Sequence, residues 1–178
     1  MNFELDTKIL IGDEAVNAST VISNIEQHRA GFADISTVLG TVVARIDGTE
    51  YGAELRDPIV RLVDQWVRKL PWVLGGDTEA VAFRNSEHCF AFVPAGDAIE
   101  FSHFAGSESE VEDYLLDPTT VRLDAFATQT LRMGERILEF IQKIDAGLLS
   151  TNDDCRDLQA SIDEGRKAWR EYQLHNRR

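Results

Sequence analysis

Residues 79–104 read EAVAFRNSEHCFAFVPAGDAIEFSHF and give the clearest indication of the fold. Large apolar residues alternate here with polar or small ones, and this period of two is typical of half-buried strands. We predict a three-stranded meander, with strands at 79–84, 87–93 and 98–104 and two-residue turns at Asn85-Ser86 and Ala95-Gly96.

Two-residue turns determine which residues face each other in the meander. The first turn pairs Val81 with Phe90. The second turn pairs Phe90 with Phe101, and it places His88 opposite His103. Both turns place the same residues on one apolar face. Burying each of these side chains contributes about 1.5–3 kcal/mol to stability. We expect that face to form much of the core: Val81, Phe83, Phe90, Phe92, Ile99 and Phe101.

Toward the N-terminus, residues 41–55 predict a hairpin. Asp47-Gly48 is typical of a two-residue mirror-image turn, in which glycine tolerates a positive φ. Its register places Arg45 opposite Glu50 as an exposed ion pair. Residues 2–11 alternate and predict a further strand, whereas 17–39 fits a short helix and, nearly as well, a strand.

Three helices are expected around these strands. Asp57-Pro58 predicts the first, because aspartate caps free N–H groups and proline suits the first helical position. Pro71 predicts a kink, and Gly75-Gly76 the end of that helix. Two more are predicted at 124–146 and 153–173, and the short loop between them indicates an antiparallel pair.

These patterns predict a single α+β domain over residues 1–178. It would contain an antiparallel sheet, made of the hairpin and the meander, with an inserted helix and two C-terminal helices packed on one face. Residues 1–120 would form a β-rich acidic part and residues 121–178 a helical hairpin. We expect residues 106–118 to be an acidic connection with a short amphipathic turn.

The net charge limits the partners of the chain. There are 31 acidic residues against 18 Lys and Arg, a net charge of −13, and the pI is about 4.6. The excess lies in residues 1–57 and 58–120, with −6 and −7, while residues 121–178 are neutral. Nucleic acids and anionic membranes are therefore disfavoured as partners. The charge serves solubility, or it attracts a basic protein.

The sequence contains no signature of catalysis or of targeting. It has no GxSxG, HExxH or GxxxxGK[ST] motif. Cys89 and Cys155 lie far apart and match neither a disulfide framework nor a zinc pattern. No apolar run reaches 18 residues, and residues 1–6 lack the basic and apolar regions of a secretory signal. We expect a cytoplasmic protein without a cofactor.

One pair of residues could support chemistry. If His88 and His103 face each other, their Cβ atoms lie about 4.5–5.5 Å apart. Such a pair could share a metal or act as a pH switch. The simpler interpretation is a histidine pair at the end of an apolar face, satisfied by backbone or water, and the lack of a third ligand in the sequence favours it.

The segment from Thr41 to Phe104 resembles the immunity proteins, small bacterial proteins encoded beside polymorphic toxins. The resemblance rests on a hairpin, then Asp57-Pro58-Ile59-Val60-Arg61-Leu62 opening a helix, then an antiparallel meander, together with strong acidity. It implies an α+β fold and stoichiometric blocking of a toxin rather than catalysis.

We therefore expect a non-catalytic, immunity-like or inhibitor-like protein whose acidic surface binds a basic protein. The candidate contact residues are Glu108, Glu110, Glu112, Asp113, Glu79 and Glu100. One alternative is a metal-binding protein or enzyme centred on His88 and His103. Another is a structural or regulatory dimer formed through Trp169 and Tyr172 on the last helix.

Overall fold

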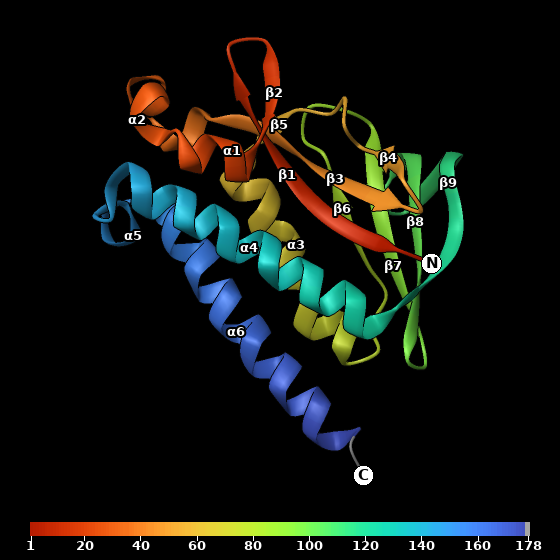
Figure 1. The fold of residues 1–178 in the computed structure, drawn as a ribbon. Helices are drawn as coiled ribbons and strands as arrows, with labels where there is room; N and C mark the ends of the chain where they lie inside the picture. Colours follow the sequence, from red (N-terminus) through yellow and green to blue (C-terminus); the bar gives the residue numbers. More distant parts are fainter. Residues whose placement is uncertain (177–178) are drawn as a thin grey trace.

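The structure, a computed structural model, describes residues 1–176 and combines two antiparallel sheets with a group of helices (Figure 1). This confirms the predicted α+β class. The strands are divided between two sheets, whereas a single sheet was expected. One cluster of buried side chains includes residues from the first strand, both sheets and the C-terminal helices.

The first sheet, sheet A, is built from the N-terminal third of the chain. Its order is β2-β1-β3-β4, with β5 also paired to β3. The strands are β1 (Phe3–Ile11), β2 (Glu14–Asn17), β3 (Leu39–Ile46), β4 (Thr49–Tyr51) and β5 (Asp57–Pro58). Arg45 lies opposite Glu50 as predicted. Asp47 and Gly48 both have positive φ, 46° and 89°, as a mirror-image turn requires.

The second sheet, sheet B, is the meander with one strand more than predicted. Its order follows the chain, with β6 (Glu79–Ala82), β7 (His88–Ala95), β8 (Ala98–Ser107) and β9 (Glu110–Arg122). The pairing of Val81 with Phe90 is confirmed. The predicted register of the second turn is wrong by two residues, because the loop is Gly96-Asp97 and not Ala95-Gly96.

The register shift leaves the apolar face intact. Phe90 faces His103 and Phe92 faces Phe101. Side chains alternate between faces with a period of two, so a shift of two residues keeps each on its own side. All six side chains predicted for this face are buried: Val81, Phe83, Phe90, Phe92, Ile99 and Phe101.

The helices fill the space beside the sheets. The long ones are α3 (Ile59–Leu74), α4 (Leu123–Asp145) and α6 (Asp153–His175), and the short ones are α1 (Ala18–Ser23), α2 (Ile25–His28) and α5 (Leu148–Thr151). Two 3₁₀ turns, Arg29–Phe32 and Ile35–Thr37, complete the ambiguous N-terminal segment, which is therefore helical. In Figure 1, α4 lies along β1 and α6 runs back beside α3 and α4.

Asp57 does not have the capping role that the sequence indicated. The helix begins at Ile59 with Pro58 as its N-cap, and α3 continues through Pro71. The Asp57 carboxylate, which is 1% exposed, instead accepts hydrogen bonds from the backbone N–H groups of Arg84 and Asn85, at 2.7 and 3.1 Å. Asp57 therefore ties the β6–β7 turn to the start of α3.

Trp66 connects α3 to sheet B. Its fully buried ring lies 5.2 Å from the ring centroid of Phe90, 4.9 Å from that of Phe92 and 6.2 Å from that of Phe101. The opposite side of α3 contacts α4 and α6. A Cβ atom at Gly134 of α4 would lie 2.8 Å from Val67 Cγ2, so glycine is needed for this close packing.

We expect Trp66→Ala to lower the free energy of unfolding by about 3–5 kcal/mol, because it removes the ring that joins α3 to sheet B. Urea denaturation measures the loss. Trp72→Ala is the matched control on the same helix, since Trp72 is 58% exposed and its loss should stay within about 0.5 kcal/mol. Equal losses in the two variants would contradict this account of the core.

Asp57→Ala should cost about 1–3 kcal/mol of stability, because it leaves two backbone N–H groups without their acceptor. Asp57→Asn retains one carbonyl oxygen and should cost less. The amide resonances of Arg84 and Asn85 should change in both variants, which NMR measures directly. If both variants unfold like the wild type, Asp57 does not hold the turn.

Candidate functional site

Strand β9 is an exposed edge strand. It pairs with β8 on one side, and within residues 1–176 no strand pairs with its other side (Figure 1). Residues 110–115 are all exposed, so both faces of this part of the strand meet solvent. The prediction of an acidic connection over residues 106–118 is thus wrong, because most of this segment is paired with β8.

The register of β9 against β8 shifts three times. Gly106 and Ala105 are neighbours on β8, but their partners Val111 and Asp113 are separated by Glu112, which is the extra residue. Each extra residue is a β-bulge, which twists the strand and redirects the side chains around it.

The two other bulges lie further along β9. Leu115 is the second extra residue, between Tyr114 and Leu116, and a third lies within Asp117-Pro118. Three bulges in a strand of 13 residues break its alternation, which explains why the sequence pattern did not predict a strand. Acidic residues and proline are also rare in strands.

Most of the excess charge belongs to sheet B. Residues 77–122, which end with the last residue of β9, contain ten acidic residues and two basic residues, a net charge of −8. Within residues 1–176, Glu79 is the one member of the ten that forms an ion pair, with Lys69 at 2.9 Å. The other nine carboxylates have no cation within ion-pair distance in that range, although the charges of Asp97 and Arg122 interact at longer range.

The structure brings four of the six predicted contact residues together. Glu110, Glu112 and Asp113 lie on β9, and Glu108 lies in the turn before it; all four are exposed. Asp117 extends this group along the strand. We call the set the acidic edge: Glu108, Glu110, Glu112, Asp113 and Asp117.

The two remaining predicted residues lie apart from the acidic edge. Glu79 is on β6, at the opposite edge of sheet B, where Lys69 neutralises it. Glu100 is half-buried on β8, and its carboxylate accepts a hydrogen bond from the Thr120 hydroxyl at 2.9 Å. Neither side chain is free for a partner in the way that the acidic edge is.

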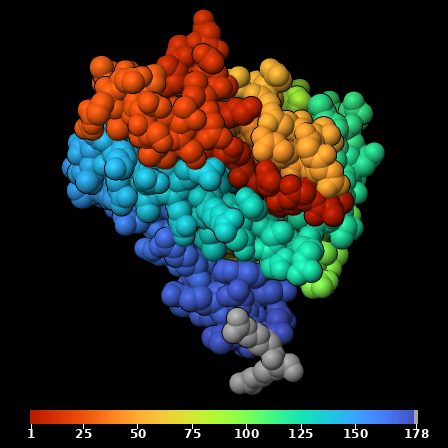
Figure 2. All heavy atoms as spheres, viewed as in Figure 1, coloured from red at the N-terminus to blue at the C-terminus, as the bar shows by residue number. Residues whose placement is uncertain are grey.

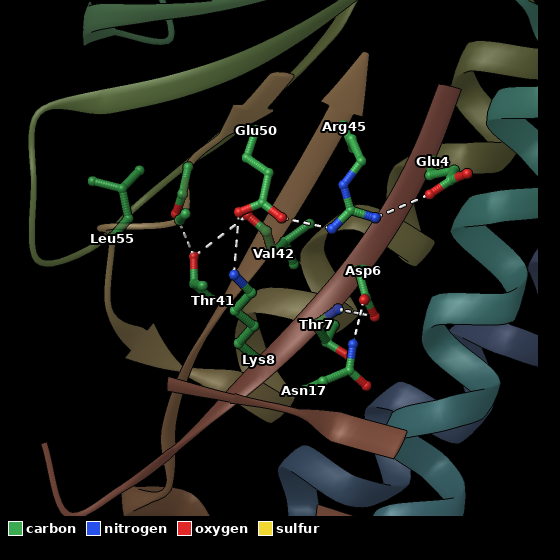
Figure 3. Close-up of polar contacts among 12 residues, drawn as sticks. Glu4, Asp6, Thr7, Lys8, Asn17, Thr41, Val42, Arg45, Glu50 and Leu55 are labelled. Atoms are coloured by element: carbon green, nitrogen blue, oxygen red, sulfur yellow. Dashed lines mark hydrogen bonds and ion pairs between the residues drawn. The ribbon is translucent and has the colours of Figure 1, made fainter. Parts of the chain in front are cut away.

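Carboxylates of sheet A are arranged differently, as Figure 3 shows. Glu50 lies between Arg45, at 2.6 Å, and Lys8, at 3.2 Å, and Arg45 also contacts Glu4. The hydrogen bond from Arg45 is the main reason that the pKa of the Glu50 carboxyl lies below its ordinary value. Asp6 likewise pairs with Arg136 from α4. The carboxylates of Glu4, Asp6 and Glu50 are thus each paired with a cation within the fold.

Three apolar residues of β9, which lie among the residues of the acidic edge, were not identified as site residues from the sequence. Val111, Tyr114 and Leu115 are 42%, 42% and 48% exposed. We expected these three residues to form a short amphipathic turn, which would have buried them. The sequence did contain a signal for this surface, namely three apolar residues within a run of acidic ones. Exposed groups of apolar side chains mark interaction surfaces.

His88 and His103 meet diagonally, not directly across the strands. Because of the register shift, His103 lies opposite Phe90 and His88 lies opposite Ala105. His88 Nδ1 is nevertheless 3.2 Å from His103 Nε2, a hydrogen-bond distance. The His103 ring is 4% exposed and stacks on Phe90 with a centroid distance of 4.4 Å.

The surroundings of His103 favour its neutral form. Burial, and then the neighbouring His88, lower the pKa of His103 from 6.5 to about 4. Its Nδ1 atom is buried without a hydrogen-bond partner. Within residues 1–176 no group of three or more His, Cys, Asp or Glu side chains could hold a metal ion, so the pair has no third protein ligand in that range.

Trp169 and Tyr172 stack on each other near the end of α6, with ring centroids 5.6 Å apart. Both are half-buried and pack against the core cluster. They line an open cavity of about 740 Å³ together with Asp97 and Arg122. The residues of the acidic edge do not line this cavity. The last turns of α6, which carry Trp169 and Tyr172, protrude from the body of the protein (Figures 1 and 2).

None of the helices in residues 1–176 has the length and apolar character needed to cross a membrane. Comparisons with protein-family models, curated proteins and solved structures gave no match to this chain.

The buried His103 predicts a loss of stability in acid. The unfolded chain takes up a proton near pH 6.5, whereas folded His103 does so only near pH 4. Its contribution to stability is therefore complete above pH 6.5 and declines toward pH 4, by at most about 1.4 kcal/mol per pH unit.

Urea denaturation between pH 7.5 and pH 4 would measure this decline. His103→Phe keeps an aromatic ring against Phe90 and should remove that part of the pH dependence. His175→Phe, at an exposed position, should leave the wild-type slope. Parallel pH profiles for the wild type and His103→Phe would show that His103 is not the responsible group.

Proposed function

We propose that this protein is a non-catalytic binding protein of the immunity or inhibitor kind, and that its acidic edge binds a basic protein partner. The observation that carries the proposal is the charge of sheet B, a net −8 over residues 77–122, where most of the carboxylates form no ion pair within residues 1–176. A carboxylate without a cation beside it is available to a partner's Lys or Arg.

The exposure of the acidic edge supports the same proposal. Its carboxylates lie on an edge strand and on the adjoining turn, where a large partner can approach without obstruction. Opposite potentials on two proteins speed their encounter and help to exclude wrong partners. The exposed apolar side chains on β9, with charged side chains around them, also match the apolar centre and polar rim of a protein interface.

The resemblance of residues 41–104 to toxin immunity proteins suggests that the partner is a toxin. The protein would then bind this toxin in one-to-one stoichiometry and cover a cationic surface that the toxin needs. We further propose that it acts in the cytoplasm, where the two buried free thiols, Cys89 and Cys155, would remain reduced.

Association kinetics test the proposal once a partner has been captured from a lysate of the native organism. The variant Glu108→Gln/Glu110→Gln/Glu112→Gln/Asp113→Asn should lower the association rate about tenfold or more at low salt, because it removes the steering charge. The dissociation rate should change less. The wild-type association rate should itself fall as ionic strength rises.

The matched control is Glu139→Gln/Asp163→Asn/Glu164→Gln/Glu171→Gln. It makes the same change in net charge at four exposed positions on α4 and α6, far from β9 in the sequence. We expect it to associate nearly as fast as the wild type. An equal slowing in both variants would show that overall charge matters and the acidic edge does not, and a rate that ignores ionic strength would contradict electrostatic steering altogether.

A further inference from the structure

Strand β9 carries three features that hinder the addition of another strand to its edge. It has three bulges, it is lined with carboxylates, and Pro118 lacks a backbone N–H. Edge strands use these devices to avoid pairing with other chains. Recognition at this edge through main-chain hydrogen bonds is therefore unfavourable, and side chains remain as the means of contact.

Two exposed apolar side chains of β9, those of Tyr114 and Leu115, differ in their surroundings. The Tyr114 ring packs edge-on against Phe104, with centroids 6.0 Å apart, and Phe104 is 3% exposed. This buried ring supports Tyr114, yet Tyr114 remains 42% exposed. Leu115 is a bulged residue without a cross-strand partner and is 48% exposed. Adjacent residues thus give one supported aromatic surface and one protruding aliphatic group.

The charge around these side chains limits what can cover them. Glu112 and Asp113 precede them, Asp117 follows, and no basic residue occurs between residues 106 and 121. A second copy that docked through the same edge would bring two sets of carboxylates together, which is repulsive. The occupant that fits is an apolar side chain with Lys or Arg beside it.

We propose that Tyr114 and Leu115 form the apolar anchor of the acidic edge, and that they bind an apolar side chain flanked by basic residues on the partner, by side-chain contacts and without strand addition. This inference rests on the proposed function and specifies how the partner is recognised. The carboxylates accelerate the encounter, whereas the anchor, once water is excluded from it, slows dissociation.

Defined peptides test the inference without knowledge of the natural partner. The first probe is a short peptide that alternates arginine with leucine, and the second replaces each leucine with serine. A third is the first probe with an N-methyl group on every amide, which blocks strand pairing through either edge of the peptide but retains the side chains. Titration of ¹⁵N-labelled protein at low salt gives both the affinity and the residues whose amide resonances shift.

The leucine probe should shift resonances of β9 and bind about tenfold more tightly than the serine probe. Its N-methylated form should bind equally well. Leu115→Ser and Tyr114→Ala should each remove most of the difference between the leucine and serine probes while leaving binding of the serine probe unchanged. Val93→Ser is the matched control, because Val93 is 41% exposed but lies on β7.

The possible failures separate the two proposals. If the leucine and serine probes bind β9 equally, the anchor is wrong while the acidic edge still binds cations. If N-methylation abolishes binding, the edge accepts a strand and the inference is overturned. If no probe shifts β9 resonances, the proposed function of the acidic edge fails together with the anchor.

Discussion

The contact of Trp66 with the phenyl rings of sheet B is the interaction on which the rest of the structure depends. Phe90, Phe92 and Phe101 come from β7 and β8, so the ring holds the middle of the sheet against α3. Strand β9 follows β8 in the meander and pairs with no further strand within residues 1–176, so it lies at the edge of the sheet, beyond the rings that Trp66 contacts. Its residues 110–115, which include three acidic ones, are exposed there.

Charge is divided between the two sheets according to what lies beside each of them. Lys8 and Arg45 of sheet A, together with Arg136 of α4, form ion pairs with Glu4, Asp6 and Glu50. Residues 77–122, which contain sheet B, have two basic residues, Arg84 and Arg122, and most of their carboxylates form no ion pair among the residues described. A negative charge that the fold does not compensate creates a potential that reaches about a Debye length, roughly 10 Å, into solution.

The histidine pair illustrates how the same sheet combines a stable core with a less regular edge. His103 is paired with Leu116 between two register shifts of β9, and its own ring is buried against Phe90. A neutral imidazole fits that position, whereas an imidazolium would be desolvated. The irregular pairing of β9 does not disturb this packing, because the extra residues of the bulges all lie on β9, the edge strand, and none lies on β8.

Local spacing and turn chemistry were enough to predict the apolar face of the meander, the Asp47-Gly48 turn and the long C-terminal helices. Contacts between distant segments fix the course of β9, the second turn at Gly96-Asp97 and the role of Asp57 in holding the β6–β7 turn. An edge strand with bulges is stabilised by backbone hydrogen bonds to its neighbour and not by an alternating pattern of its own. Which carboxylates lack a cation was likewise decided by residues distant in the sequence, since Arg136 reaches Asp6 only in the folded chain.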